Sequence, residues 1–325
     1  MKAWGLAILA LLSCGPVCAK TIKFDPPGSA RTNPTSIDAG GAIVGWYLDS
    51  NDEDHGFLRA SDGTITNIGV RGGKCGTISW GVNGKGAIVG TYLNGQCAEN
   101  GFLRSAKGTV ATFDVPGATD TTAWGINNTG VIVGWYTDSN GNANGFLRAV
   151  NGTFATFDPP GTLTTAPILI NNSGVTTGPY IDKDGYIEGF ARAVDGTITT
   201  FDVENSSETD VNCINDAGYI VGEYYTDDTF DGYLRAPDGT ITNIQPDETI
   251  ETFVTAINDK GVITGAYETE DGMQHGFVRS AAGTYTTFDP RGSTDTYPEA
   301  IDKSGAITGW WTDSNNQIHG FLRTP

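Results

Sequence analysis

Short hydrophobic runs alternate with polar turns along the whole chain. In one stretch, β-branched and aromatic residues occupy 123–127 and 130–136, which meet at Asn-Asn-Thr-Gly, a hairpin signal. Two further runs, 145–149 and 153–157, are joined through an Asn-Gly pair in which both residues tolerate a positive φ. Asp-Pro-Pro-Gly follows and removes a backbone donor, so it ends the ladder. This pattern predicts four short strands.

The same pattern recurs at a nearly constant spacing. Its copies begin at Thr21, Thr64, Thr109, Thr153, Thr197, Thr240 and Thr284, which are 43 to 45 residues apart. A period of this size, made of short strands and Gly-rich turns, is typical of a β-propeller in which each copy forms one blade. We therefore predict an all-β, seven-bladed β-propeller with four antiparallel strands per blade, folded as a single domain over residues 20–325.

The two ends of the chain complement each other. The last copy stops after residues 320–323, one strand short of a complete blade. Residues 21–25 have the sequence of the missing outer strand and precede the first inner strand. We predict that this N-terminal strand pairs with the last strand and closes the ring, which would leave no open sheet edge between the first and last blades.

An apolar segment, residues 3–13, follows the N-terminal Met-Lys. It resembles the core of a secretory signal peptide, and Val-Cys-Ala at 17–19 supplies small residues for cleavage. We predict a signal peptide over residues 1–19 and a secreted, extracellular or periplasmic protein. The alternative is a lipoprotein, because Leu-Leu-Ser-Cys resembles a lipobox that would acylate Cys14. No later segment is a transmembrane candidate.

The chain is strongly acidic, with a formal net charge of −19 and a pI near 4.3. This charge would repel the phosphates of nucleic acid and anionic membrane surfaces. It favours solubility, cations, and basic or neutral partners. We expect a monomer that binds no nucleic acid and inserts into no membrane.

Three cysteines remain after the predicted cleavage. Cys75 lies in a connection between blades and Cys97 in the loop between the second and third strands of the same blade. Both kinds of loop emerge on the same face of a propeller, so we predict a Cys75–Cys97 disulfide, as expected in an oxidising compartment. Cys213 falls on an inner strand where other copies carry mostly small residues, which indicates a buried thiol.

Residues that recur in every copy are expected to be structural. One position on the third strand is always Arg, namely Arg59, Arg104, Arg148, Arg192, Arg235, Arg279 and Arg323. We expect this guanidinium to bridge carbonyls of neighbouring blades or the strand-end acids Asp114, Asp158, Asp202 and Asp289. The alternative is a ring of anion-binding arginines. Because the three His residues belong to separate blades, we do not expect a metal triad.

The third strand also carries a family resemblance. His55-Gly56-Phe57, His275-Gly276-Phe277 and His319-Gly320-Phe321 resemble the His-Ala-Phe tripeptide of the HAF repeat, found in probable extracellular bacterial proteins. Gly replaces the central Ala here, and the other copies carry Asn, Glu or Asp in place of His. The resemblance covers the whole mature chain. It implies export and a propeller-like repeat fold, and it implies no chemistry.

Acidic and amide residues recur at alternate positions in the loops between the second and third strands. The candidates are Asp49, Asn51 and Glu53; Asp138, Asn140 and Asn142; Asp182 and Asp184; and Asp313, Asn315 and Gln317. Hard cations such as Ca²⁺ bind several oxygen ligands, so this spacing predicts Ca²⁺ in one or more loops. The alternative is ordinary turn chemistry, because no loop supplies the distal Glu of an EF-hand.

Tryptophans occupy two positions that vary between copies. Trp80 and Trp124 stand on inner strands where other copies carry Thr35, Ile168, Asn212, Thr255 and Glu299. Trp46, Trp135 and Trp310 follow a Gly on the second strand, where others carry Thr91, Pro179, Glu223 and Ala266. Exposed indole faces near polar side chains commonly hold neutral saccharides. The alternative is that these rings fill gaps between blades.

Catalytic motifs such as G-x-S-x-G and H-E-x-x-H are absent from the sequence. We therefore favour a secreted binding or interaction module, with a saccharide or a surface protein as its ligand. The alternative is an extracellular hydrolase or lyase that acts on a polysaccharide or ester through loop carboxylates, for example Glu204, Glu208, Asp210, Asp247, Glu248 and Glu251. An enzyme predicts carboxylates with perturbed pKa values converging on one pocket, and a binding module predicts aromatic-lined sites. A third hypothesis, a scaffolding surface protein, predicts no pocket.

Overall fold

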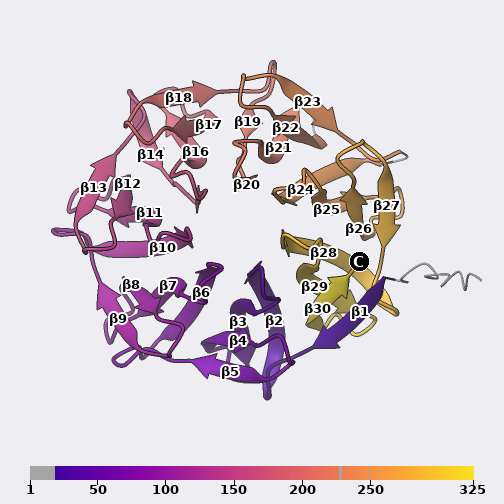
Figure 1. Cartoon of the computed structure of the whole chain (residues 1–325), viewed down its shortest axis with the longest axis horizontal. Coiled ribbons are helices and arrows are strands. Elements are labelled where there is room, and N and C mark those ends of the chain that lie inside the picture. Colours follow the sequence, from indigo (N-terminus) through magenta and orange to yellow (C-terminus); the bar gives the residue numbers. More distant parts are fainter. Residues whose placement is uncertain (1–18, 227–228, 248) are drawn as a thin grey trace, which may run out of the picture.

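The computed structural model describes residues 19–226, 229–247 and 249–325. In these ranges the regular structure consists of β-strands, and no helix there is long and apolar enough to cross a membrane. The strands lie around a central axis, and in most groups the first strand lies nearest to it (Figure 1). Nearly all of the predicted signal peptide, including Cys14, lies outside the described residues.

The sequence repeats fold into groups of antiparallel strands, which we number as units in chain order. Unit 1 contains β2 (Ser29–Ile37), β3 (Ile43–Asp49), β4 (Asp54–Arg59) and β5 (Ile65–Ile68). Unit 2 contains β6 (Gly76–Val82), β7 (Ile88–Leu93), β8 (Glu99–Arg104) and β9 (Val110–Phe113). Unit 3 contains β10 (Asp120–Ile126), β11 (Ile132–Thr137), β12 (Ala143–Arg148) and β13 (Phe154–Phe157).

The inner strand is interrupted in units 4 and 5 and continuous in units 6 and 7. Unit 4 contains β14 (Thr162–Thr165), β15 (Leu169–Ile170), β16 (Thr176–Asp182), β17 (Ile187–Arg192) and β18 (Ile198–Phe201). Unit 5 contains β19 (Glu208–Thr209), β20 (Cys213–Ile214), β21 (Ile220–Thr226), β22 (Thr229–Arg235) and β23 (Ile241–Ile244). Unit 6 contains β24 (Glu251–Ile257), β25 (Ile263–Glu268), β26 (Gln274–Arg279) and β27 (Tyr285–Phe288). Unit 7 contains β28 (Ser293–Ile301), β29 (Ile307–Asp313) and β30 (Ile318–Thr324).

The first strand of the chain, β1 (Lys20–Phe24), lies on unit 7 rather than on unit 1. It pairs antiparallel with β30 over its whole length, from Lys20 opposite Thr324 to Phe24 opposite Gly320. Beside this ladder, Nδ1 of His319 lies 2.8 Å from a carboxylate oxygen of Asp25. The N-terminal strand is therefore attached to the C-terminal end of the chain, as the sequence predicts.

The hydrophobic core lies between neighbouring units. In one cluster, Val44 and Ile68 of unit 1 pack with Ile88 and Phe102 of unit 2. The third strand of each unit contributes a fully buried aromatic ring, namely Phe57, Phe102, Phe146, Phe190, Tyr233, Phe277 and Phe321. The second strand approaches the inner strand so closely that a Cβ at Gly134 would lie 1.9 Å from the carbonyl oxygen of Thr122. A glycine is therefore required at that position.

Five of the seven recurring arginines contact an aromatic ring of the preceding unit, and Arg279 instead contacts Tyr285 of its own unit. The guanidinium of Arg148 lies 4.7 Å from the ring centre of Phe113 in unit 2, and that of Arg192 lies 5.0 Å from Phe157 in unit 3. Where these groups make a hydrogen bond in the described chain, they donate to the carbonyl of the next residue, as Arg59 does to Ala60. The prediction of bridges to neighbouring carbonyls or to strand-end aspartates was wrong, because five of these arginines join the units by cation–π contact instead.

Candidate functional site at the channel axis

The inner strands carry a bulge at the position where the sequence repeats differ most. In β6 the register shifts between Ser79 and Gly81, and in β10 it shifts between Ala123 and Gly125. The skipped residues are therefore Trp80 and Trp124. A bulge leaves its extra residue unpaired and turns its side chain, here toward the axis. The same kind of shift occurs in β2, β24 and β28.

One residue from this position in each unit lines a single cavity of about 540 Å³ on the axis, which we call the axial pocket. These residues are Thr35, Trp80, Trp124, Ile168, Asn212, Thr255 and Glu299. In units 4 and 5, Ile168 and Asn212 lie in the break of the inner strand. The pocket lies toward the start of the inner strands, since Arg31 and Asn33 of β2 also line it.

Aromatic rings form one wall of the axial pocket. The indoles of Trp80 and Trp124 stack with ring centres 4.0 Å apart, and Trp135 contacts Trp124 at 5.2 Å. Trp46 also lines the pocket, with the guanidinium of Arg31 at 5.6 Å from its ring centre. All four tryptophans are partly buried. This wall offers the flat apolar surface against which a ring-shaped ligand can stack.

The wall on the side of units 5 and 7 combines aromatic rings with carboxylates. Tyr297 and Trp310 stack with ring centres 5.1 Å apart, and Nε1 of Trp310 donates a hydrogen bond of 3.0 Å to Glu299. Asn212 donates a hydrogen bond of 3.1 Å to Glu223. The pocket therefore places two carboxylates beside stacked aromatic rings.

Burial controls the protonation of these carboxylates. Burial and the nearby Asp210 raise the pKa of Glu223 to about 8. Burial raises the pKa of Glu299 to about 7, although the hydrogen bond from Trp310 acts in the opposite direction. Burial and a hydrogen bond with Glu208 raise the pKa of Asp210 to about 6. Near neutral pH the pocket therefore holds carboxyl groups that retain protons, as acid–base chemistry also requires.

The structure brings most of the predicted tryptophans together. Trp46, Trp80, Trp124 and Trp310 line the axial pocket, whereas Trp135 only contacts Trp124. Glu223, Glu299 and Tyr297 were not selected as site residues from the sequence. A signal for the two glutamates was present, because Glu299 shares a repeat position with Trp80 and Glu223 shares one with Trp46.

The carboxylates suggested for catalysis fall into two groups. Glu208 and Asp210 lie close enough to Glu223 to raise its pKa. Glu204 and Asp247 are exposed. Within the described chain, none of these four residues lines the axial pocket, and Glu251 does not line it either. Glu248 lies outside the described residues.

The acidic loops form hydrogen-bonded turns. One carboxylate oxygen of Asp49 accepts the backbone N–H groups of Asn51 at 2.8 Å and Glu53 at 3.1 Å, which lowers the pKa of Asp49 to about 2. Asp138, Asp182 and Asp313 likewise each accept two backbone N–H groups with one carboxylate oxygen. These bonds explain why an Asp begins each loop. Ca²⁺ binding by the loops stays a prediction from the sequence.

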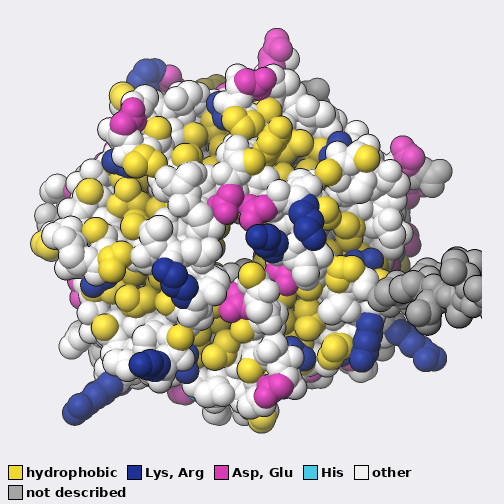
Figure 2. Space-filling model, viewed as in Figure 1, with side chains coloured by type: hydrophobic (Ala, Val, Ile, Leu, Met, Phe, Trp, Pro, Cys, Tyr) yellow, Lys and Arg dark blue, Asp and Glu magenta, His cyan; other side chains and the backbone are white. Residues whose placement is uncertain are grey.

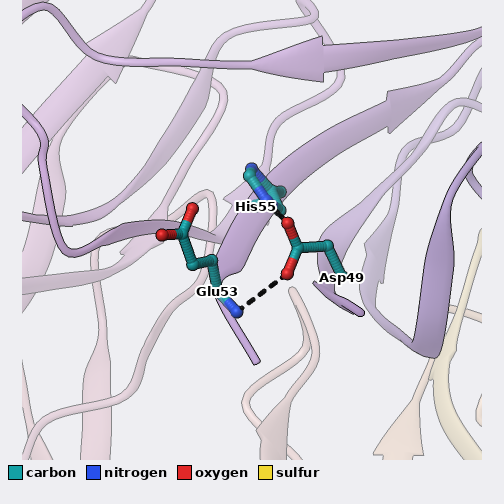
Figure 3. A group of neighbouring side chains, drawn as sticks. All are labelled: Asp49, Glu53 and His55. Carbon is teal, nitrogen blue, oxygen red and sulfur yellow. Dashed lines mark hydrogen bonds and ion pairs between the residues drawn. The ribbon is translucent and has the colours of Figure 1, made fainter. Parts of the chain in front are cut away.

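The loop of unit 1 also contains a histidine. Nε2 of His55 lies 3.2 Å from Asp49, and Figure 3 shows this pair beside the bond from the Glu53 backbone N–H to Asp49. One potential ligand atom from each of these three residues lies within 4.8 Å of the others. The other two histidines contact strand-end aspartates, since His275 contacts Asp289 and His319 contacts Asp25. Nε2 of His319 also lies 3.7 Å from the loop residue Asp313.

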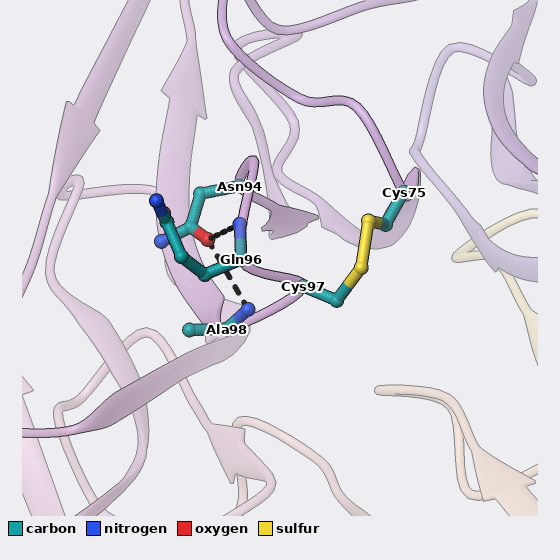
Figure 4. Close-up of a disulfide and its surroundings, with 5 residues drawn as sticks. All are labelled: Cys75, Asn94, Gln96, Cys97 and Ala98. Atoms are coloured by element: carbon teal, nitrogen blue, oxygen red, sulfur yellow. Dashed lines mark hydrogen bonds between the residues drawn. A yellow bond between two sulfur atoms is a disulfide. The ribbon is translucent and has the colours of Figure 1, made fainter.

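A disulfide joins two loops on the same side of unit 2 (Figure 4). Cys75 precedes the inner strand and Cys97 lies in the loop between β7 and β8, and their Cα atoms are 5.5 Å apart. Cys97 has a positive φ of 58°, in a turn where Asn94 accepts backbone N–H groups of Gln96 and Ala98. The third cysteine, Cys213, is a free thiol, and burial raises its pKa to about 11.

The opposite end of the channel has a different lining. A second cavity, of about 440 Å³, lies at the turns between the first and second strands. Five aliphatic residues line both cavities and so mark the boundary between them, namely Ile37, Val82, Ile126, Ile170 and Ile301. Figure 2 shows one face of the molecule, on which acidic and basic side chains gather around a central opening.

A ladder of asparagines surrounds this second cavity. Nδ2 of Asn83 donates to the carbonyl of Asn127 at 2.9 Å, and Asn127 donates to that of Asn171 at 3.2 Å. The same bond continues through Asn215 and Asn258 to the carbonyl of Asp302. We call this chain of bonds the asparagine ladder. Each bond joins one unit to the next.

Comparison with known proteins supports the fold and leaves the function open. No protein-family model matches the chain, and no curated protein sequence matches it. Among solved structures, a streptogramin B lyase is 15% identical with a TM-score of 0.60, over 94% of this chain and 98% of the other. The β-propeller domain of the Trilobed protease from Pyrococcus furiosus is 10% identical with a TM-score of 0.61, over 91% and 94%. The BP39L lectin from Burkholderia pseudomallei is 11% identical with a TM-score of 0.57, over 92% and 98%.

Proposed function

We propose that this protein is a secreted, seven-bladed β-propeller that binds a saccharide in the axial pocket. At these identities the likeness to solved structures establishes a β-propeller fold alone. The proposed blade count is supported by the sequence repeats and by seven pocket residues, one from each repeat, and the proposed closure is supported by the pairing of β1 with β30. Secretion rests on the signal-peptide pattern and on the resemblance to HAF repeats.

The observation that carries the binding function is the gathering of Trp46, Trp80, Trp124, Trp310 and Tyr297 in one cavity. Saccharide rings stack on aromatic faces through their C–H groups, and their hydroxyls need hydrogen-bond partners. The side chains of Asn212 and the two pocket glutamates supply such partners within the same lining. A cavity of about 540 Å³ is within the usual size range for small-molecule sites. One of the similar structures is itself a lectin.

Titration calorimetry with a panel of oligosaccharides tests this function. We expect binding by the folded protein and a loss of roughly tenfold or more in affinity for Trp80→Ala, because the variant removes one stacked indole. Tyr186→Ala is the matched control, since Tyr186 is an exposed aromatic residue at 55% accessibility outside the pocket lining. Equal affinities for the two variants would contradict the site, and no binding of any saccharide would contradict the function.

A second candidate function is hydrolysis or elimination on a polysaccharide or ester. The observation that favours it is the pair of glutamates with raised pKa values in the same pocket. A protonated carboxyl can act as a general acid while a neighbouring carboxylate acts as a base. Product release from the saccharide panel, measured for the native chain and for Glu299→Gln, distinguishes the two functions. Turnover that the substitution abolishes would assign an enzyme, and binding without turnover would assign a binding module.

A further inference from the structure

We propose that the axial pocket selects amino saccharides and binds their protonated amine between Glu223 and Glu299. This inference rests on the proposed saccharide function and names the class of ligand. It depends on three properties of the pocket, which are the carboxylate oxygens left without partners, the lack of a compensating cation, and the aromatic rings beside Glu299.

The two glutamates each retain an oxygen for a ligand. In the described chain, Glu223 accepts one hydrogen bond, from Asn212 at 3.1 Å, and Glu299 accepts one, from Trp310 at 3.0 Å. Each of these bonds uses one oxygen of its own carboxyl group. The second oxygen of each residue accepts no hydrogen bond from the described residues. An ammonium group has three donors, which suit two carboxylates and one further acceptor.

No positive charge in the lining balances these acids. Among the residues that line the axial pocket, the basic side chain is Arg31, and it stacks over Trp46 and donates to Asn33 at 3.3 Å. The other titratable groups that influence Glu223 are Asp210 and Glu208, which add negative charge. A cationic ligand would therefore meet no competing cation beside these acids when its binding ionises them.

Aromatic side chains also lie beside these acids. Tyr297 and Trp310 stack beside Glu299, and the hydroxyl of Tyr233 donates to the carbonyl of Asp210 at 2.8 Å. Burial raises the pKa values of both tyrosines well above the usual range, so neither is ionised at neutral pH. An ammonium beside Glu299 also meets aromatic faces, which attract cations. The stacked indoles of Trp80 and Trp124 remain available for the sugar ring.

Binding of such a ligand must displace protons. At about pH 6 the empty pocket holds protons on both glutamates, because the pKa values are raised to about 8 and about 7. A protonated amine favours the ionised carboxylates and therefore expels a proton to solvent. A neutral saccharide leaves the protons in place. A measurement of proton release therefore distinguishes binding of the charged amine from stacking of the sugar ring.

The test is titration calorimetry of the native chain at pH 6 in two buffers of different ionisation enthalpy. The probes are a glucosamine trimer and its N-acetylated counterpart, which share the sugar rings and differ in charge. We expect about tenfold tighter binding of the glucosamine trimer, with net release of a proton, and no release with the acetylated form. Glu223→Gln with Glu299→Gln should remove the preference and the release, while both trimers still bind.

The alternatives give different results. Equal or weaker binding of the glucosamine trimer, with the acetylated trimer bound, would overturn the charge selection and keep the saccharide function. The glucosamine trimer could bind more tightly without releasing a proton, or its tighter binding could survive both substitutions. Either result would place the amine elsewhere and overturn the assignment to these glutamates. Failure of every saccharide in the panel to bind would overturn the proposed function itself.

Discussion

The two ends of the channel are built from the same repeat, but one end is lined by a constant residue type and the other by residues that vary between units. At one end the asparagine ladder repeats a single residue type, and each amide uses its donor to bond to the next unit. At the other end the bulge position carries Thr, Trp, Ile, Asn or Glu and directs it into the axial pocket. The comparison shows that the conserved repeat position joins the units, whereas the variable repeat position lines the pocket.

The ladder leaves little for a ligand to bind. In unit 3, the side-chain oxygen of Asn127 accepts backbone N–H groups of Thr129, Gly130 and Val131, and its Nδ2 donates to Asn171. Both polar atoms of this buried amide are therefore satisfied within the protein. Each bulge residue forms at most two side-chain hydrogen bonds with the described residues, and all seven bulge residues line the cavity.

The largest expected effect comes from breaking the ladder. Asn127→Ala removes the bond to Asn171 and leaves buried backbone groups without partners, so we expect a loss of about 2 kcal/mol in the free energy of unfolding. Chemical denaturation measures this loss. Asn140→Ala, in an exposed loop, is the control and should change stability by less than about 0.5 kcal/mol. Saccharide affinity of the folded Asn127→Ala protein should be unchanged, and a large loss of affinity would break the comparison.

We expect an intermediate effect of pH on stability, and this effect arises from the axial pocket and not from the asparagine ladder. The folded-state pKa values of Glu223 and Glu299 are about 8 and about 7, above the value of roughly 4.3 in an unfolded chain. The folded protein then retains protons that the unfolded chain has lost, so stability is fully present below the unfolded pKa and declines as pH rises through the folded pKa.

Melting temperatures across this interval check the sign. We expect the melting temperature to fall between about pH 5 and pH 8, and we expect Glu223→Gln with Glu299→Gln to flatten the decline. The ladder variant should keep the native pH profile with a lower melting temperature throughout. A melting temperature that rises with pH would show that these glutamates are ionised in the folded protein.

The smallest expected effect concerns the acidic loops. One oxygen of Asp138 accepts two backbone N–H groups and the other accepts the side-chain amides of Asn140 and Asn142, so a Ca²⁺ ion would have to displace these amides. We expect Ca²⁺ to raise the melting temperature of the EDTA-treated chain by about 2 °C, through weak native-state binding. Asp138→Asn tests the loop, and Mg²⁺ is the control ion. No shift with Ca²⁺ would leave the loop aspartates as turn residues.

The sequence predicts the architecture better than the site for a physical reason. Strand runs, turn residues and the extra N-terminal strand are local patterns, and the β1–β30 pairing follows from them. The bulges could not be read from alternation, since a one-residue register shift depends on the paired strand. Glu223 and Glu299 lie 76 positions apart in the sequence, and only the fold brings their side chains to one cavity.

The arginines illustrate the same limit. Their constant spacing correctly indicated a structural role, but Arg148 reaches Phe113, which lies in the outer strand of the preceding unit. The sequence pattern suggested backbone carbonyls and strand-end aspartates as partners, and it did not indicate the aromatic rings. Selecting among them requires the packing of one unit against the next.

The asparagine ladder has a direction and two ends. It runs from Asn83 to Asp302 and stops there, because Asp302 and the corresponding Asp38 have no side-chain N–H to donate. Units 2 to 7 can therefore assemble in succession through ladder bonds between neighbours. Unit 1 has no ladder bond to unit 2 or to unit 7. Pairing of β1 with β30 joins the most distant segments of the chain, and such contacts form late in folding. A circular permutant that opens the chain between units 1 and 2 would make β1–β30 a local hairpin, and it should fold faster while keeping the same axial pocket.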